Sequence, residues 1–315
     1  MVGDWLAKLK FPSLLLALGV IVSLLAISSR ADLKKGVFES GPAVWPALVL
    51  GFTLCLLGVL TFLAQEGLMP SVGLGRTRKV GNAFTACIGS SRVALHVGRL
   101  EDVVPASSGA ERQMVMLPTN EFFDDDCVHA TNTACGAYVG AKIKEPRYLE
   151  KLKAQIADAR KGLKSLGQVE KRGGEFETTY GTGVCLFIED PAGLPHSLLL
   201  AAVAFKRADT GFQSDPASVF QCLEKMAKRA TDERVNTVYL PLLGAGKGSL
   251  SAEASLMTTL LAISTLQRRL GGFDAKINIV IFQPDKKAFP AIAPRTARKL
   301  LGLAADLHSR VPALN

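Results

Sequence analysis

The stretch that decides the fold reads Val238-Tyr-Leu-Pro-Leu-Leu-Gly-Ala-Gly-Lys-Gly248. A β-branched and aromatic run leads into glycines at 244, 246 and 248, and an apolar-periodic segment opens behind them at Ser249 or Ser251. Glycine permits positive φ and lets a ligand approach the backbone without a Cβ in the way. Inward-turned amides backed by a helix N-terminus bind anions. The stretch therefore predicts a strand, a glycine loop and a helix, with a phosphate or diphosphate held by backbone N–H groups.

Three other interpretations of this loop are possible. A Walker A loop requires glycine at 241 and Ser or Thr at 248, where the chain has Pro241 and Gly248, so that motif is excluded. A dinucleotide fingerprint would place its third glycine at Ser249, in the first strand–helix–strand unit of a domain. This loop lies near the C-terminus instead, which disfavours that motif. A glycine-rich turn with no ligand remains an alternative.

Two uncharged runs near the start account for the high apolar content of 48% in 315 residues. They cover 11–29 and 40–65, and as helices each is long enough to cross a hydrocarbon core of about 30 Å. Trp5 and Trp45 lie at their edges, as interfacial aromatic residues do. We expect a transmembrane helical hairpin over 1–66, with spans at about 11–29 and 44–63. Two buried core helices are the alternative.

Basic residues around these runs predict the topology. Lys8 and Lys10 before the hairpin, with Arg76, Arg78 and Lys79 after it, outnumber the three basic residues of the loop at 30–35. The positive-inside rule then places both termini in the cytoplasm, so we expect a multi-pass protein of the cell (inner) membrane with a cytosolic C-terminal domain. The first run also resembles a signal peptide with a cleavage site at 26–28; whether it is cleaved stays open.

The formal charge of +9 does not indicate nucleic-acid binding. Residues 1–80 hold eight Lys/Arg and four Asp/Glu, which leaves +5 spread over 235 residues with no basic block. Aromatic content is only 7%, so a nucleic-acid-binding surface is not expected. None of the six cysteines forms a Cys-x-x-Cys pair, which is typical of reduced, mostly buried thiols in a cytosolic domain.

After a glycine- and proline-containing linker at 67–90, the chain reads as one α/β domain over 91–315. Apolar and β-branched clusters predict strands at 92–97, 113–117, 184–188, 198–205, 235–240 and 277–282. Apolar residues at three- and four-residue spacing predict helices at 147–166, from 216 onward, from 249 or 251 to 269, and at 296–308. Residues 171–182 read as a loop. The unit at 235–282 is a right-handed crossover between parallel neighbours, which predicts a mixed sheet between helices.

Residues 118–126 read as a loop at the carboxyl end of a strand, where ligands bind in such sheets. Its three aspartates, 124–126, could bind a hard cation, but a solvated loop or helix start is favoured. Cys127, His129 and Cys135 do not have zinc spacing. No Ser-His-Asp or Cys-His arrangement is evident, so we expect no catalytic residues and no metal.

This order of elements, with Leu-Pro-Thr-Asn at 117–120 and Pro-Leu-Leu-Gly-Ala-Gly-Lys-Gly at 241–248, resembles a macro domain. It is most similar to the divergent macro domain of effectors in the Thoeris anti-phage defence system. Those proteins also have Asn-x-Phe-Phe-Asp, here 120–124, and a Gly-Thr-Gly strand start, here 181–183. One class of them carries two N-terminal transmembrane helices. The resemblance predicts an α/β fold in which this hairpin precedes a macro-domain-like α/β/α sandwich with a mixed sheet.

The resemblance implies a ligand, ADP-ribose or an ADP-ribose derivative, with no other cofactor. By position, the diphosphate would lie on Gly244, Ala245, Gly246, Lys247 and Gly248. The distal ribose and its substituent would approach Thr119, Asn120, Phe122, Ala134, Cys135 and Gly136. Asp102 stands near the family's adenine-binding acid, although the spacing at 98–102 departs from the pattern. Hydrolytic macro domains have an Ala-Ala-Asn or glutamate-rich loop, and 117–123 has neither, which disfavours catalysis.

Two classes of function follow. The first is a membrane effector whose macro domain binds a signal nucleotide made by a TIR-domain partner, and which then forms a homo-oligomer that disrupts the membrane. The second is a membrane-tethered ADP-ribosyl hydrolase or a passive ADP-ribose-binding module.

Overall fold

The computed structural model describes residues 77–106, 111–124, 126–171, 175–207, 211–270, 273–285, 288 and 290–310. The chain divides at Gly73, and all of these residues belong to the part that begins at Leu74. The predicted transmembrane hairpin at 1–66 lies outside the described residues. Within the described part of the chain, no helix combines the length and apolar character needed to cross a membrane.

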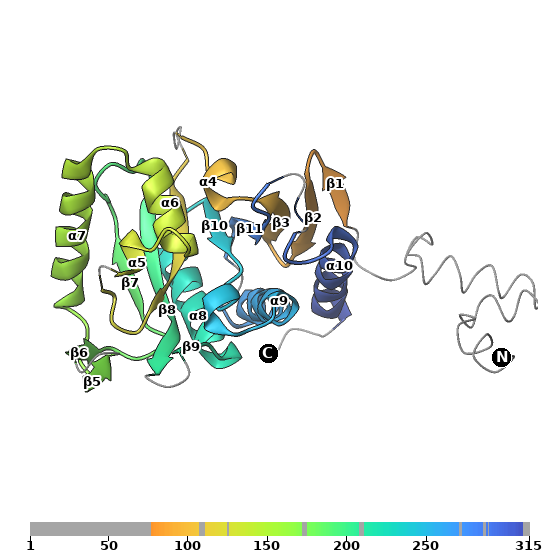
Figure 1. Cartoon of the computed structure of the whole chain (residues 1–315). Coiled ribbons are helices and arrows are strands. Elements are labelled where there is room, and N and C mark those ends of the chain that lie inside the picture. The colour runs from red at the N-terminus through yellow and green to blue at the C-terminus, as the bar shows by residue number, and fades with distance from the viewer. Residues whose placement is uncertain are drawn as a thin grey trace, which may run out of the picture. The chain divides into compact units, whose positions relative to one another are not determined.

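A mixed sheet organises the fold (Figure 1). Its strand order is β1-β2-β3-β11-β10-β4-β8-β7, with β9 paired to the end of β8. The pairs β3/β11, β11/β10, β10/β4 and β4/β8 are parallel, and the outer strands are antiparallel. The strands are β1 (Arg78–Val80), β2 (Ala83–Ile88), β3 (Ser91–Gly98), β4 (Gln113–Asn120), β7 (Cys185–Ile188), β8 (Ser197–Arg207), β9 (Gly211–Gln213), β10 (Thr237–Pro241) and β11 (Lys276–Phe282).

Helices cover both faces of this sheet because alternate strand residues point to opposite sides. Leu95, Met116, Leu240 and Ile279 pack on one side against the helices α8 (Pro216–Asp232), α9 (Ala252–Arg269) and α10 (Pro294–Arg310). Their strand neighbours, such as Leu117, face the helices of the other side, which are α4 (Leu100–Val103), α5 (Asp126–His129), α6 (Ala134–Lys142) and α7 (Pro146–Arg160). The predicted α/β/α sandwich with a mixed sheet is confirmed.

The helices after the glycine loop and after Asp215 begin where their capping residues predict. Asp215 caps α8 by accepting a 2.8 Å hydrogen bond from the Ser218 amide, and Pro216 is its first residue. Ser251 caps α9 by accepting from the Ala254 amide at 3.1 Å. Each side-chain oxygen satisfies one of the amides that a helix N-terminus leaves unpaired. The crossover β10–α9–β11 joins parallel neighbours, as expected.

Several predicted boundaries were wrong. The linker at 67–90 contains the strands β1 and β2. The chain turns at Gly81 between β1 and β2 and at Gly89 between β2 and β3, and both glycines have positive φ. Glycines that close tight hairpins give the same composition as a linker. The loop at 171–182 contains part of a second hairpin, formed by β5 (Gly167–Lys171) and β6 (Glu175–Thr179), whose polar residues hide the strand pattern.

Two further elements end elsewhere than predicted. α7 ends at Arg160 and not at 166, because Lys161 leads into a turn that contains Gly162. Thr119 and Asn120 belong to the end of β4 and not to a loop, and a β-bulge between them shifts the pairing with β8. The described cysteines, 87, 127, 135, 185 and 222, are free, and only Cys87 is exposed.

Candidate ligand-binding site

The glycine loop leaves β10 at the carboxyl edge of the sheet. Gly244 and Gly246 have φ of 74° and 77°, and residues 246–248 form a 3-10 turn, η1 (Gly246–Gly248), which ends at Ser249 with φ 66°. The Leu250 amide donates to the Gly244 carbonyl at 3.2 Å and closes the loop on itself. The Ser255 hydroxyl of α9 donates to the Leu243 carbonyl at 2.6 Å. The loop is therefore anchored at both ends, and its tip, Gly246 and Lys247, is exposed.

The three glycines of the loop face different surroundings. A Cβ on Gly244 would lie 3.0 Å from Cβ of Ser214, and a Cβ on Gly248 would collide with the Ser214 hydroxyl. A Cβ on Gly246 would meet nothing within 4 Å. Gly244 and Gly248 therefore provide close packing on Ser214, whereas Gly246 borders open space.

The end of β4 forms a second wall, and its asparagine is already engaged. The Asn120 Oδ1 accepts from the Phe122 amide at 3.0 Å, and its Nδ2 donates to the Asp124 carboxylate at 3.1 Å. Asp124 is buried and not solvated, whereas the helix start predicted for the aspartates at 124–126 is present, because α5 begins at Asp126. Thr119 is 6% exposed, and its hydroxyl oxygen has no hydrogen-bond partner among the described residues. Asn120 thus shapes the turn, while Thr119 keeps unused hydrogen-bonding capacity.

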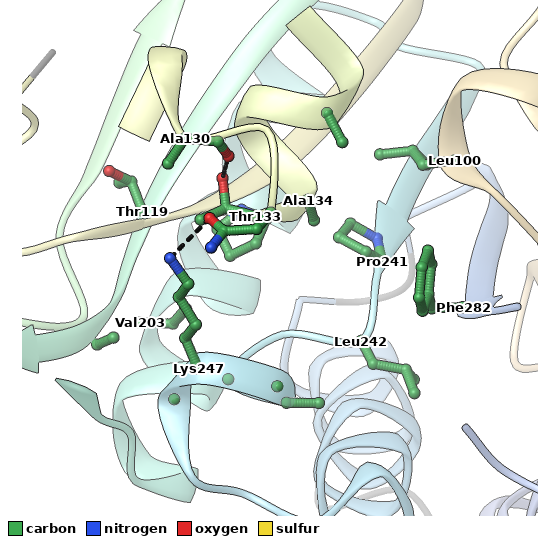
Figure 2. A pocket seen from close by; sticks show the side chains of 18 of the residues that line it. Leu100, Thr119, Ala130, Thr133, Ala134, Val203, Pro241, Leu242, Lys247 and Phe282 are labelled. Carbon is green, nitrogen blue, oxygen red and sulfur yellow. Dashed lines mark hydrogen bonds between the residues drawn. The ribbon is translucent and has the colours of Figure 1, made fainter. Parts of the chain in front are cut away.

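The segment between α5 and α6 closes the third side. Thr133 caps α6 by accepting from the Gly136 amide at 3.0 Å and donates to the Ala130 carbonyl at 2.7 Å. Lys247 reaches across from the glycine loop and donates to Asn132 Oδ1 at 2.8 Å. Figure 2 shows Lys247 pointing from the loop toward this segment. One hydrogen bond therefore joins two walls of the site.

These walls enclose a cavity of about 700 Å³ at the carboxyl ends of β3, β4, β8, β10 and β11. That volume is typical of small-molecule sites. Eight of the twelve predicted ligand-binding residues line it: Thr119, Asn120, Ala134, Gly244, Ala245, Gly246, Lys247 and Gly248. The structure thus brings the end of β4 and the start of α6 together with a glycine loop that lies more than a hundred positions further along the sequence.

The other four predicted residues do not line the cavity. Phe122 and Cys135 are fully buried. A Cβ on Gly136 would overlap the Ala130 carbonyl oxygen, so this glycine serves a helix-to-turn contact. Asp102 is exposed to solvent on α4.

Glu101 lines the cavity where Asp102 was expected. Successive residues of a helix point about 100° apart, so only one acid of the 101–102 pair can face inward from this single turn. The Glu101 carboxylate lies 3.2 Å from Nε of Arg99, which also lines the cavity. The cavity wall therefore offers one acidic and one basic group side by side.

Sequence reasoning also missed Phe282, Leu100 and Ser214. Phe282 ends β11, is 56% exposed and lines the cavity, as Leu100 also does (Figure 2). An aromatic residue at the carboxyl end of a predicted parallel strand was a usable signal. Ser214, between β9 and α8, carries a buried hydroxyl oxygen with no partner among the described residues. Nothing in its sequence context indicates a site.

Two cysteines near the cavity are engaged in hydrogen bonds. The pKa of Cys135 is raised well above its usual value by a hydrogen bond with the Cys127 thiol and by burial. Cys127, which lines the cavity, donates to the Asp124 carbonyl at 2.9 Å. The raised pKa makes the Cys135 thiol a weak nucleophile, because the thiolate is the reactive form.

The sheet order, the two covering helix layers and the cavity at the carboxyl edge define a macro-domain α/β fold. The family model described as "Thoeris protein ThsA, Macro domain" matches residues 110–282. The match covers more than half of the chain, and the chain belongs to this family.

Solved macrodomain structures resemble the fold at low sequence identity. A glycine-to-valine mutant of the Oceanobacillus iheyensis macrodomain with ADPR is 11% identical, with a TM-score of 0.47 over 72% of this chain and 100% of that chain. The macrodomain of the same organism with ADP is 12% identical, with a TM-score of 0.45 over 73% and 98%. The Trypanosoma brucei macrodomain in complex with ADP-ribose is 11% identical, with a TM-score of 0.37 over 67% of each chain. No curated protein matches the chain.

Proposed function

We propose that this protein is a membrane-anchored anti-phage defence effector whose macro domain binds ADP-ribose or an ADP-ribose derivative. The observation that carries the proposal is the glycine loop, whose exposed tip at Gly246 borders a cavity of about 700 Å³ with no side chain in the way. Backbone amides in such a loop are suited to phosphate oxygens. Membership of the Thoeris ThsA macro-domain family supports the same ligand class.

The walls suggest how such a ligand would lie. The diphosphate is proposed to rest on Gly244 to Gly248, with Lys247 exchanging Asn132 for a phosphate oxygen. The base is proposed to stack on the exposed Phe282 ring, close to Leu100, where Glu101 can accept hydrogen bonds from an amino group. The distal ribose and its substituent would then face Thr119 and Ala134. In this arrangement Glu101 takes the role first expected of Asp102.

We propose a sensor rather than a hydrolase. The Asn120 amide, which could otherwise orient a water, is engaged on both sides by Phe122 and Asp124. Glu101, the acidic side chain that borders the cavity on α4, lies beside Arg99. Neither arrangement favours a general base, which needs a group within hydrogen-bond reach of the proton that it abstracts.

The remaining parts of the proposal concern the cell. The hairpin at 1–66 would hold the macro domain at the cytosolic face of the inner membrane, and a TIR-domain partner would make the nucleotide. Binding would then favour a homo-oligomer that disrupts the membrane. These parts rest on the two uncharged runs of the sequence and on the resemblance to Thoeris effectors.

Calorimetry of the full-length protein with ADP-ribose tests the ligand class. We expect saturable binding, and mass spectrometry after incubation should return ADP-ribosylated substrates and the nucleotide unchanged. Hydrolysed products would favour the membrane-tethered hydrolase instead. A protein that binds no ADP-ribose-type nucleotide would contradict the proposal.

Reporter fusions test the anchoring. A periplasmic reporter fused after residue 36 should be active, and the same reporter fused after residue 80 should be inactive. If the full chain is as soluble without detergent as residues 81–315, the hairpin is not a membrane anchor.

A further inference from the structure

Ser214 lies directly beneath the glycine loop. It follows β9, which packs beside η1, and it precedes the Asp215 cap of α8. Gly244 and Gly248 both face it so closely that a Cβ on either would meet its side chain. Ser214 also lines the cavity. It therefore touches both the loop that is proposed to hold phosphate and the space that the ligand would fill.

The Ser214 hydroxyl is buried and has no hydrogen-bond partner among the described residues. A buried hydroxyl without a partner costs free energy. The neighbouring Asp215 carboxylate accepts from the Ser218 amide at 2.8 Å and from the Ser218 hydroxyl at 2.7 Å, and it does not accept a hydrogen bond from Ser214. Ser214 lines the cavity, so a rotation of its side chain between staggered rotamers could bring the hydroxyl to a partner that arrives there.

We infer that Ser214 is an anion-binding residue of this site, whose hydroxyl donates to a phosphate oxygen seated on the glycine loop. This inference rests on the proposed function and adds a side-chain donor from outside the loop to the backbone amides. Because the unbound state leaves the hydroxyl without a partner, the hydrogen bond formed on binding contributes more to affinity than one exchanged for an existing partner. It also gives a reason for the glycine at 248, because a Cβ there would overlap the hydroxyl oxygen that acts as the donor.

Ser214→Ala in the full-length protein separates this role from a structural one. We expect a melting temperature equal to or up to about 3 °C higher than that of the wild type, because an unpaired buried oxygen is removed. Affinity for ADP-ribose should fall about tenfold, as for loss of a hydrogen bond to a charged group. A variant that loses both stability and affinity, or that keeps wild-type affinity, overturns the inference.

Thr259→Val is the matched control. Thr259 is fully buried on α9, and its hydroxyl also has no partner among the described residues, but it does not line the cavity. Its substitution should raise the melting temperature in the same way and leave ADP-ribose affinity unchanged. Equal losses of affinity in both variants would assign the effect to repacking and contradict a contact made by Ser214.

Inorganic pyrophosphate is the second probe, since it carries the same anion without ribose or base. If the wild type binds pyrophosphate but not ADP-ribose, the proposed function fails, and the Ser214 inference is decided by whether Ser214→Ala weakens pyrophosphate binding. If Gly246→Val abolishes ADP-ribose binding while Ser214→Ala binds as the wild type does, the proposed function stands and the inference on Ser214 fails. If the wild type binds neither probe, both are overturned.

Discussion

Gly246 is the residue on which the ligand proposal depends most directly. Its φ of 77° disfavours any side chain, yet a Cβ there would meet no atom within 4 Å. Gly244 and Gly248 differ from it, because a Cβ at 244 would crowd Leu250 and Ser214, and a Cβ at 248 would overlap the Ser214 hydroxyl. All three glycines line the cavity, but of the three only Gly246 would carry an added side chain into open space.

Gly246→Val should lower affinity for ADP-ribose by at least about 2 kcal/mol, roughly thirtyfold, if several amide contacts are lost. The branched side chain would occupy the space that a diphosphate needs, and the domain should remain folded because the loop tip is exposed. Calorimetry of the full-length variant measures the effect. Gly81→Val is the matched control, since Gly81 also has positive φ and open surroundings but lies between β1 and β2. Equal affinities of Gly246→Val and wild type would place the site elsewhere.

At the scale of elements, the sequence predicted well whatever depends on local capping and apolar periodicity. Asp215-Pro216 and Ser251 marked the starts of α8 and α9. The predicted ends of β10, which precedes the glycine loop, and of β11, which follows α9, lie within two residues of the observed ends. The sequence did not predict the strands whose conformation depends on hydrogen bonds to a neighbouring strand. The hairpin β5–β6 is a short, polar ribbon without a buried face for most of its length, so its strands have no alternation to detect.

A hydrogen bond joins α6, a helix of the layer that borders the cavity, to the residue that precedes β8. The Tyr138 hydroxyl lies 2.5 Å from Nε2 of His196, and both side chains are buried. Burial lowers the pKa of His196 from 6.5 to about 4, with a further lowering by the charge of Lys142. The imidazole therefore stays neutral in the folded protein at pH values where it is protonated in the unfolded chain.

This difference predicts a loss of stability in mild acid. Between pH 6.5 and pH 4 the unfolded state binds the proton and the folded state does not, so stability falls as pH falls, by at most about 1.4 kcal/mol per pH unit. His196→Gln should flatten that slope in urea unfolding of the full-length protein in detergent. His129→Gln, which removes an exposed imidazole, is the control for the effect of a His→Gln change in itself. An unchanged slope in His196→Gln would show that this imidazole does not titrate between these pH values.

At the scale of the whole molecule, the cavity shows which parts of a site a sequence can predict. Parallel strands end at one edge of a sheet, so the loops after β4 and β10 could be expected to meet there. Which acid of α4 faces the cavity depends on the direction of its side chain. The position of Ser214 depends on packing between segments that are distant in the sequence. The residues at 98–102 do not predict which acid faces the cavity, so Asp102 was chosen over Glu101. The residues at 211–216 do not predict the packing of Ser214, so Ser214 was not considered.

We predict that ligand binding drives several copies of the protein to assemble in the membrane. Neither uncharged run contains Asp, Glu, Lys, Arg or His, so a single hairpin would offer no polar path across the bilayer, and damage would require several copies. Small residues at helical spacing, Gly19 with Ser23 and Ala47 with Gly51, permit close helix contacts. A ligand can drive assembly only if it binds the assembled state more tightly than the resting one. It must therefore touch a surface that changes on assembly, and the segment 119–140 beside the cavity is our candidate.

Adding the nucleotide to purified full-length protein should raise its mass in light scattering and release dye from proteoliposomes. The Gly246→Val variant should show neither the rise in mass nor the dye release. Tight binding by the wild type with no change in mass and no leakage would contradict the effector mechanism and leave a passive membrane-bound binder.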